Sequence, residues 1–487
     1  MPLTQRSKAP TFSGPELCFK EAHEVVALLK AGEVSPQDLL QAAYDRIASV
    51  EPAVNAMPIL CPDRAGAAAD ALPSGAPDGR GWLAGMPVAI KDLTPVAGVL
   101  CTWGTRAMAD NVAEKSDPLV ARIEANGGIV IGKTNTPEFG AGGNTFNAVF
   151  GKTRNPYDTT MNAAGSSGGA AVSLATGEVW LSHGSDHGGS LRTPAAYNGI
   201  VGLRPSPGLC ASDSEIGFIT EGQQGPMARS VRDCALFLDA MAGFDPTIPS
   251  SFPAPCEGSY EQAVIAAPDA VRIAFSPDLG GLSPVEPVID GAIRDALRAV
   301  EKNGGVIEEV TPDLTALEPT YHTLRGLLWA SAFKRAPESL TRHFKPTLAE
   351  NTAFGQALTI DDITEAQLNR TTLFKTMTAL LGDFDVLACP VVGNMPRPVD
   401  VEWVDEVNGV RFDGYMDWLR FAFLATTTGL PAISVPIGFD DTGMPLAIQL
   451  IGPHRGESRL LSVARAVERA VGGPFPPIDP RVTHKGV

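Results

Sequence analysis

The sequence predicts an α/β protein whose core is a single large mixed β-sheet with helices on both faces. The apolar run VRIAF at 271–275 precedes a helix that ends at 301–305, and the strand-like VIEEV at 306–310 follows. Strand, helix and strand in this order predict a βαβ unit, whose strands pair in parallel through a right-handed crossover. Ala432–Gly438 and Pro445–Ile451 flank a DDTG turn, which predicts an antiparallel hairpin. Parallel and antiparallel pairs together indicate a mixed sheet.

The chain begins with a segment, residues 1–12, that we expect to be a flexible tail, and a helical region follows it. One helix is expected to begin at Ser35, which precedes Pro36 and a capping acid, and to end at Pro52. Its apolar face consists of residues at helical spacing, namely Leu39, Leu40, Ala43, Ile47 and Val50. Residues 62–82, which are rich in Ala, Gly, Pro and Asp, are expected to form an excursion on the surface.

The elements after this excursion alternate between strand and helix. The short apolar run MPVAI predicts a strand that ends at Lys91. A helix capped by Asp117 is expected to run to Asn126, and the strand Ile129–Ile131 follows it. Because no clear linker interrupts the chain, we expect residues 13–487 to form one domain.

The composition excludes several classes of protein. Of the 487 residues, 44% are hydrophobic and 19% are charged, which excludes a disordered chain. The net charge of −17 opposes binding to phosphates and excludes nucleic acid as a partner. No stretch approaches the ~20 apolar residues that cross a bilayer, and the first residues lack the apolar core of a signal peptide. Seven cysteines without a CxxC pair indicate neither a disulfide framework nor a zinc site, so we expect a cytoplasmic protein without cofactors.

Two short motifs match catalytic patterns that their surroundings do not support. Gly127–Thr134 fits the phosphate-binding pattern G-x-x-x-x-G-K-[ST], but its intervening residues resemble a strand, so Lys133 is interpreted as a strand-end lysine. Gly165–Gly169 fits G-x-S-x-G with Ser167 as nucleophile, but no clear apolar strand precedes this turn. Chain order alone leaves that second interpretation open, since histidines are available later in the chain at His322, His343, His454 and His484.

A third pattern would be a zinc site on His183 and His187, which are four residues apart. Such a pair needs a helix, and the glycines at 184, 188 and 189 oppose one. No glutamate stands where the HExxH pattern requires it. We therefore expect no metal at these residues.

The strongest signal is a set of linked motifs. From Gly165 the chain contains GSSGGAAVSLATGEVWLSHGSDHGGSLRTPAAYNG, after GMPVAIKD at residues 85–92. This set resembles the amidase signature family, in which two serines and a lysine form the catalytic set. Lys91, Ser166 and Ser190 match that set, and the two serines are 24 residues apart, as in the family. The likeness covers roughly residues 20 to 470, with GKTNTPEF, RNPYD, GLPAISVPIG and LAIQLIGP as flanking matches.

The resemblance implies a role for each of these residues. Ser190 would be the nucleophile, and Lys91 would act as its base through the hydroxyl of Ser166. An amide carbonyl is a poor electrophile, which favours a covalent acyl-enzyme. A free lysine has a pKa of about 10.4 and is charged at neutral pH. Burial beside the apolar residues 88–90 would lower the pKa of Lys91 and give a neutral amine.

The resemblance also implies the surroundings of the nucleophile. The peptide bond from Gly165 to Ser166 would be cis. The oxyanion would be bound by the backbone N–H groups of His187, Gly188, Gly189 and Ser190. His187 departs from the threonine or aliphatic residue that is common in the family at this position. Asp186 and Arg192 are expected to form a buried pair that supports the turn, and a surface pair is the alternative.

We place the signature core at about residues 80–210. Residues 310–425 match the family least, and in the family this stretch often shapes the substrate pockets. Aromatic residues in such a stretch lie more often in the core than in a substrate pocket, so none is assigned to the site. The aromatic residues considered are Tyr321, Trp329, Phe333, Phe354, Phe374 and Trp418.

The function that the resemblance implies is hydrolysis of small or aryl amides. A narrower likeness to urethanases from soil metagenomes extends the expected substrates to carbamates. One alternative is the family's amidotransferase subunit, which frees ammonia from glutamine inside a complex; the net charge of −17 argues against it. A second is an inactive binding module, which the intact catalytic set argues against. The expected partner is a small-molecule substrate, and the expected state is a monomer or a homodimer.

Overall fold

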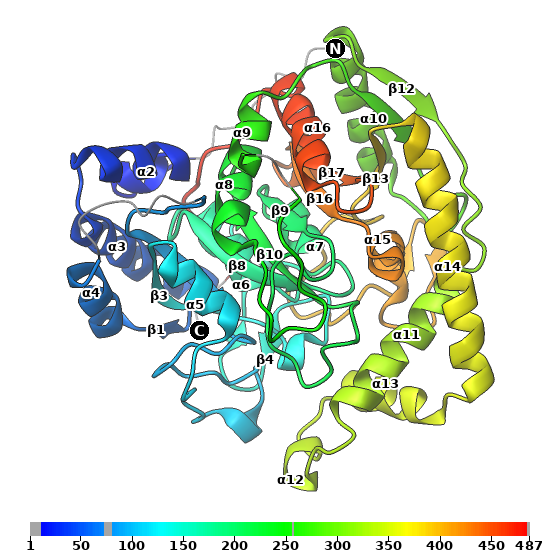
Figure 1. The fold of residues 1–487 in the computed structure, drawn as a ribbon, viewed down its shortest axis with the longest axis horizontal. Helices are drawn as coiled ribbons and strands as arrows, with labels where there is room; N and C mark the ends of the chain where they lie inside the picture. Colours follow the sequence, from blue (N-terminus) through cyan, green and yellow to red (C-terminus); the bar gives the residue numbers. More distant parts are fainter. Residues whose placement is uncertain (1–10, 73–79, 256–257, 485–487) are drawn as a thin grey trace.

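A computed structural model describes residues 11–72, 80–255 and 258–484, and its core is an eleven-stranded sheet (Figure 1). The strand order is β1-β3-β2-β8-β10-β9-β16-β17-β13-β11-β12. The strands of this sheet are β1 (Ile59–Leu60), β2 (Met86–Lys91), β3 (Gly128–Thr134), β8 (Leu181–Asp186), β9 (Val201–Arg204), β10 (Gln223–Ala228), β11 (Arg272–Phe275), β12 (Val306–Glu309), β13 (Val386–Pro390), β16 (Ala432–Phe439) and β17 (Pro445–Ile451). Short two-stranded ribbons are formed by β4 (Phe146–Asn147) with β5 (Gly151–Lys152), β6 (Arg154–Asn155) with β7 (Asp158–Asn162), and β14 (Glu406–Val407) with β15 (Val410–Arg411).

Helices connect these strands. They are α1 (Glu16–Phe19), α2 (Ala22–Ala31), α3 (Pro36–Val54), α4 (Pro62–Asp70), α5 (Pro118–Ala125), α6 (Gly168–Ala175), α7 (Arg192–Tyr197), α8 (Val231–Met241), α9 (Tyr260–Ile265), α10 (Pro287–Lys302), α11 (Leu317–Ala332), α12 (Glu338–Thr341), α13 (Pro346–Ala357), α14 (Ile360–Asp383), α15 (Phe423–Thr428) and α16 (Glu457–Ala470). Three short 3₁₀ turns are η1 (Arg106–Met108), η2 (Glu138–Gly140) and η3 (Asp417–Ala422). Within the described residues, no helix combines the length and apolar character of a membrane span.

The pairing of the strands confirms the predicted mixed sheet. β2 pairs in parallel with β3 and with β8, and β11 pairs in parallel with β12 and β13. β11, α10 and β12 are the predicted βαβ unit, and β16 and β17 are the predicted antiparallel hairpin. The helix α5, capped by the Asp117 side chain, and the strand after it are also confirmed.

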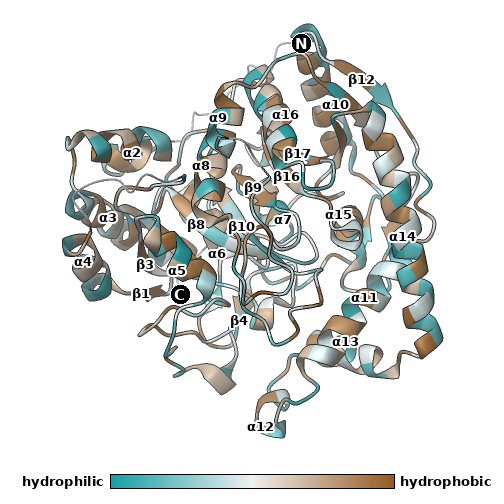
Figure 2. Ribbon diagram, in the orientation of Figure 1, coloured by the Kyte–Doolittle hydropathy of each residue, from teal (hydrophilic) through white to brown (hydrophobic). Residues whose placement is uncertain are grey.

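Helices cover both faces of the sheet. In β13, Val386 and Ala388 belong to the same hydrophobic cluster as residues of α10 and α16. The alternating residues Leu387 and Cys389 belong to a second cluster with residues of α11, α14 and α15. Because successive side chains of a strand point to opposite faces, the two clusters lie on opposite sides of the sheet. In Figure 2 the central strands are largely hydrophobic, whereas the outer helix α14 carries hydrophilic and hydrophobic stretches in turn.

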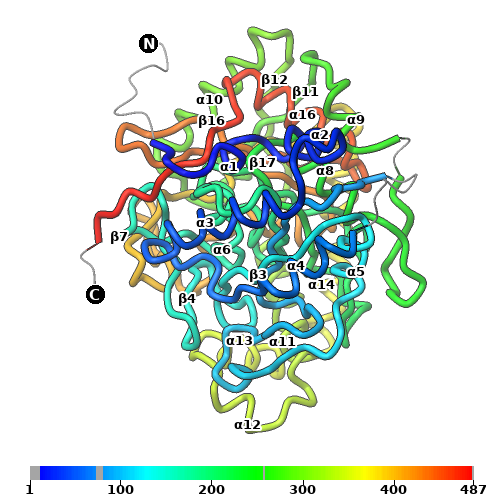
Figure 3. Tube along the Cα trace, turned by 90° about the vertical axis from the view of Figure 1, so that its left-hand side faces the viewer, coloured from blue at the N-terminus to red at the C-terminus, as the bar shows by residue number. Residues whose placement is uncertain are grey.

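Three predicted boundaries differ from the structure. Residues 1–10 of the predicted tail lie outside the described residues, but Thr11 and Phe12 are held in place. The Thr11 carbonyl accepts a hydrogen bond from the backbone of Asp479 at 2.7 Å, and Arg46 lies over the Phe12 ring. Figure 3 shows the two ends of the chain running side by side there.

The helix α3 does not end at Pro52 but continues to Val54. Pro52 lacks the N–H group that would bond to a carbonyl one turn earlier, so the helix loses one hydrogen bond near its end, and it stops at Asn55, whose backbone is left-handed. The predicted surface excursion at 62–82 is also wrong for its first half. Pro62–Asp70 forms α4, which buries Ala65 and Ala69, since alanine has the highest helix propensity and proline suits the first helical turn. Residues 73–79 lie outside the described residues.

Candidate active site

A cavity of about 340 Å³ lies at the end of the neighbouring parallel strands β2 and β8. Lys91 is the last residue of β2 and Asp186 is the last of β8, so the carboxyl ends of both strands meet there. The side of the cavity next to these strand ends is lined by Ser166, Ser185, Asp186, His187, Gly188 and Ser190. Polar groups from distant parts of the chain thus converge on one hollow, which is the usual form of a small-molecule site.

Lys91 is fully buried and is surrounded by three hydroxyl groups. Its Nζ lies 2.6 Å from Ser166 Oγ, 2.8 Å from Ser167 Oγ and 3.0 Å from Ser185 Oγ. Burial lowers the pKa of Lys91 well below its ordinary value, because desolvation disfavours the ammonium form, and the charge of Asp186 only partly opposes this. Desolvation thus favours the neutral amine, which is the form of this side chain that could accept a proton.

The hydrogen bonds of Ser167 restrict where the protons of this cluster lie. Ser167 Oγ donates to the Ser185 carbonyl at 3.2 Å, so it accepts from Lys91. A neutral amine has two N–H groups and one lone pair. Ser167 takes one N–H, so either Ser166 or Ser185 donates to the lone pair and the other accepts the second N–H. Ser166 is thus in a position to hand a proton to Lys91.

Ser166 and Ser190 enter the cavity from two glycine-rich turns. The Gly165–Ser166 peptide bond is cis, and a Cβ on Gly165 would lie 2.9 Å from the Gly142 carbonyl oxygen, so only glycine fits there. Gly189 has a φ of +94°, in the region that favours glycine, and Ser190 follows it. Among the described residues, no hydrogen bond joins Ser166 Oγ to Ser190 Oγ, although both residues line the cavity.

Asp186 anchors the turn that carries Ser190. Its carboxylate accepts hydrogen bonds from Arg192 Nη2 at 2.8 Å and Arg192 Nε at 3.1 Å, and Arg204 Nη1 lies 3.3 Å away. All three side chains are fully buried. Burial alone would raise the pKa of Asp186, but the two guanidinium groups hold it well below its usual range. Asp186 is therefore ionised, and it fixes the turn through charged hydrogen bonds.

The backbone amides of this turn do not all face the cavity. The N–H of Gly189 donates to Asp186 Oδ1 at 3.2 Å, and that of Leu191 donates to Asp186 Oδ2 at 3.0 Å. Of the four amides that the sequence indicated as oxyanion donors, those of His187, Gly188 and Ser190 have no hydrogen-bond acceptor within the described residues. Three donors thus remain for a ligand beside Ser190.

The two histidines of the candidate zinc pair face different partners. His183 Nδ1 accepts from the backbone N–H of Lys91 at 3.4 Å, and its Nε2 lies 2.9 Å from Gln224 Oε1. Burial lowers the pKa of His183 to about 3, so this ring is neutral. His187 Nδ1 instead lies 3.4 Å from both the Tyr321 hydroxyl and Arg325 Nη1. The two rings therefore do not share a common ligand position.

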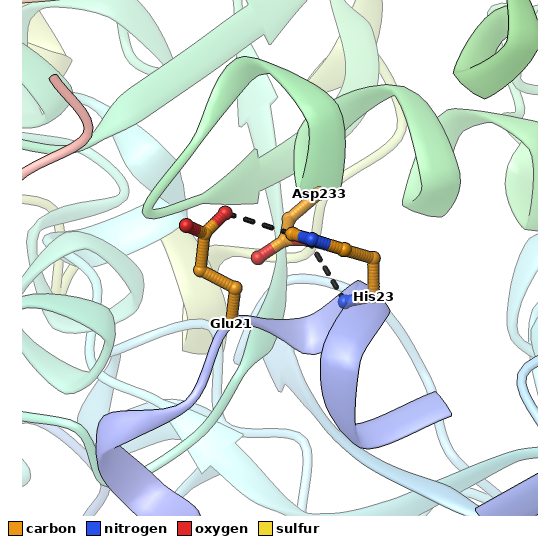
Figure 4. A group of neighbouring side chains, drawn as sticks. All are labelled: Glu21, His23 and Asp233. Carbon is orange, nitrogen blue, oxygen red and sulfur yellow. Dashed lines mark hydrogen bonds and ion pairs between the residues drawn. The ribbon is translucent and has the colours of Figure 1, made fainter. Parts of the chain in front are cut away.

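Two other groups of side chains in the described residues have the spacing of metal ligands. One is Glu21, His23 and Asp233, where Asp233 already accepts hydrogen bonds from His23 Nδ1 and from the first amides of α2 (Figure 4). The other is Glu318, His322 and Asp417, whose carboxylates both lie within 3.7 Å of Arg420. Internal partners thus account for both groups.

The structure also decides between the competing motifs. Gly128–Thr134 is the strand β3, and Lys133 is buried in an ion pair with Asp92 at 3.0 Å, so the phosphate-binding pattern is a coincidence and this lysine is not an ordinary strand-end residue. Ser167 is fully buried and bonds to Lys91 and Ser185 rather than to a histidine. The hydrolase elbow centred on Ser167 is therefore not formed.

The stretch at 310–425 contributes to the lining of the cavity. Of the six aromatic residues considered from the sequence, only Trp329 lines the cavity. The other lining residues from this stretch are Arg325, Leu328, Met416 and Leu419. Sequence reasoning missed Arg325 and Ser185, and it missed the loop at 208–224, from which Ile216 and Ile219 reach the cavity. Ser185 lies within the quoted signature, one residue before Asp186, so its position could have indicated it.

Known proteins match this chain over most of its length. A family model described as Amidase matches residues 38–461. The chain is 34% identical over 463 residues to an acylamidase of Rhodococcus erythropolis, covering 93% of this chain and 95% of that protein. It is 30% identical to a glutamyl-tRNA(Gln) amidotransferase subunit of Halothermothrix orenii, covering 94% and 98% of the two chains. A solved bacterial aryl acylamidase of the amidase signature enzymes superposes with a TM-score of 0.86 at 28% identity, covering 94% and 97%.

Proposed function

This chain belongs to the amidase signature family, and from that premise we propose that it cleaves small amides, aryl amides and carbamates through an acyl-enzyme on Ser190. Hydrolysis of amides is the activity of the family. The carbamate activity and the catalytic set of Lys91, Ser166 and Ser190 are our proposal. We further propose that residues 13–487 act as one domain, as a monomer or a homodimer.

Acylation begins with a proton transfer through two hydroxyl groups. Ser190 Oγ attacks the substrate carbonyl carbon while its proton passes to Ser166 Oγ, and the proton of Ser166 passes to the neutral Nζ of Lys91. The free amides of His187, Gly188 and Ser190 bind the oxyanion that forms on the carbonyl oxygen. Ser166 then passes its proton to the leaving nitrogen and takes one proton back from Lys91, the C–N bond breaks, and the acyl group remains on Ser190.

Deacylation repeats these steps with water. A water molecule attacks the acyl carbon while its proton passes through the relay to Lys91. The ester bond to Ser190 then breaks, and Ser190 recovers its proton. A carbamate offers the same carbonyl, and its hydrolysis yields an alcohol, an amine and carbon dioxide.

One observation supports this mechanism above the others. Lys91 is fully buried with its Nζ 2.6 Å from Ser166 Oγ, and burial lowers its pKa. A charged lysine would be a proton donor here and could not act as the base. Neither histidine near the cavity contacts Ser166 or Ser190 within the described residues, so the amine is the nearest group able to accept the proton.

Apolar side chains in the cavity lining support apolar substrates. Phe139, Leu328, Trp329 and Leu419 are among them, and together they offer flat and aliphatic surface to an aryl or alkyl group. An aryl acylamidase and an acylamidase among the similar proteins support the same substrate class.

The amidotransferase subunit is the second candidate, because relatives with that name are about as similar over most of the chain. The deciding experiment measures three reactions of the purified protein alone. These are release of 4-nitroaniline from acetyl-4-nitroanilide, its release from ethyl N-(4-nitrophenyl)carbamate, and release of ammonia from glutamine. We expect the first two and not the third. Ammonia release alone would favour the amidotransferase subunit, since freeing ammonia from glutamine is the first half of that reaction. Anilide cleavage without carbamate cleavage would show that the protein is not a urethanase.

A further inference from the structure

A buried arginine without a carboxylate partner lines the cavity wall that faces the oxyanion turn. Arg325 lies in the middle of α11, and only 4% of it is exposed. Its Nε lies 3.2 Å from Asn351 Oδ1, its Nη1 lies 3.4 Å from His187 Nδ1, and its Nη2 donates to the Tyr415 hydroxyl. All of these partners are neutral acceptors.

The other buried charges around the cavity do not compensate Arg325. Asp186 is shared between Arg192 and Arg204, so these three groups together retain one positive charge. Among the described residues, no carboxylate lies within ion-pair distance of Arg325. The remaining charged side chain of the cavity lining, Asp213, is exposed at the surface. The wall beside His187 therefore has an excess of positive charge.

Burying a charge without a counter-charge is costly, and proteins usually pair such groups. The flanking rings of Trp329 and Tyr415, whose centroids lie 5.5 and 5.6 Å from the guanidinium carbon, offset part of this cost. A guanidinium has five N–H donors, and three hydrogen bonds leave donors for a ligand. Its planar fork matches the two oxygens of a carboxylate.

We propose that Arg325 binds a carboxylate of the substrate, so that the preferred substrates are anionic amides with the acid group on the acyl or the amine side. The proposal rests on the proposed function, since it assigns the substrate class of the same cavity. A carboxylate there would complete the pairing that the fold leaves open. It would also place the anion beside His187, the first residue of the oxyanion turn.

The test compares two matched pairs of substrates. On the acyl side, succinyl-4-nitroanilide is compared with the neutral pentanoyl-4-nitroanilide. On the amine side, 4-acetamidobenzoate is compared with 4-methylacetanilide. We expect the wild type to favour the carboxylate member of at least one pair in kcat/KM. The Arg325→Met variant should lose about ten- to a hundredfold of that preference, the range that one hydrogen bond to a charged group contributes.

Arg325→Lys keeps the charge and should keep part of the preference. The matched control is Arg420→Met, which removes an arginine that pairs with Glu318 outside the cavity lining and should leave the ratio within each pair unchanged. A wild type without preference in either pair would overturn the proposal. Equal loss on both members in Arg325→Met would also overturn it, because Arg325 would then only support His187.

A binding measurement separates this proposal from the proposed function. Calorimetric titration of the Ser190→Ala variant with succinyl-4-nitroanilide and with pentanoyl-4-nitroanilide needs no turnover. Tighter binding of the carboxylate, lost on adding Arg325→Met, would support the anion site even if the wild type hydrolysed neither anilide. The same titration with 4-acetamidobenzoate and 4-methylacetanilide covers the amine side. Hydrolysis of the neutral members without any difference in binding within either pair would leave the function standing and overturn the anion site.

Discussion

Lys91 Nζ and Ser166 Oγ lie 2.6 Å apart at a position closed to solvent, and this contact joins the end of β2 to the turn before α6. Residues 75 positions apart in the chain are thereby brought into a proton-transfer distance. Desolvation at this position favours the neutral amine of Lys91, the form that could take up the proton of Ser166.

A pair of variants tests which serine is the nucleophile, Ser190 or Ser167. Ser190→Ala should reduce kcat on acetyl-4-nitroanilide by about 10⁴-fold or more, since the nucleophile is lost. Its thermal unfolding midpoint should not change, because one hydroxyl facing a cavity is removed. Ser167→Ala should retain more activity than Ser190→Ala, since Ser167 accepts a hydrogen bond from Lys91 and donates one to the Ser185 carbonyl but does not attack the substrate. Activity in Ser190→Ala together with an inactive Ser167→Ala would restore the elbow centred on Ser167.

The buried ion pairs of Asp186 with Arg192 and Arg204 should stabilise the fold as well as support the reaction rate. Asp186→Asn leaves Arg192 and Arg204 buried without their counter-charge, which should lower the free energy of unfolding by about 3–5 kcal/mol. Chemical denaturation measures this change. The exposed pair of Arg298 with Asp295 supplies the control, because Asp295→Asn should change the stability by less than about 1 kcal/mol. Equal, small effects of both variants would contradict the anchoring role of Asp186.

The neighbouring carboxyl groups of Glu178 and Glu51 should make the stability depend on pH. Glu178 is fully buried, and burial raises its pKa well above its ordinary value, with the neighbouring Glu51 adding to the shift. A carboxyl whose pKa is raised by folding stabilises the fold fully below its unfolded pKa, and this contribution is lost as the pH rises through the folded pKa. The unfolding midpoint should therefore fall from pH 5 toward alkaline pH, and Glu178→Gln should flatten this dependence. If the unfolding midpoints of the wild type and of Glu178→Gln changed with pH in the same way, the assignment to Glu178 would be contradicted.

The core of the sheet was predictable from local patterns, because the βαβ unit at 271–310 and the hairpin at 432–451 have apolar runs separated by clear turn signals. The site residues Lys91, Ser166 and Ser190 came from linked motifs rather than from any single residue. Ser185 and Arg325 were missed for a physical reason. Their roles depend on a hydroxyl 3.0 Å from Lys91 and on a charge left unpaired by the fold, and neither property exists before the chain is folded.

The central claim is that Lys91 is a neutral base, and the pH dependence of kcat/KM on acetyl-4-nitroanilide tests it most directly. In the wild type, kcat/KM should rise with pH as Lys91 loses its proton. Because burial lowers the pKa of Lys91, kcat/KM should level off well below the ordinary lysine pKa of about 10.4. Lys91→Arg keeps the positive charge but cannot lose a proton in this range, so it should be as inactive as Lys91→Ala at every pH. A Lys91→Arg variant within about tenfold of the wild type, with the same pH profile, would show that this residue acts through charge or packing and would contradict the account.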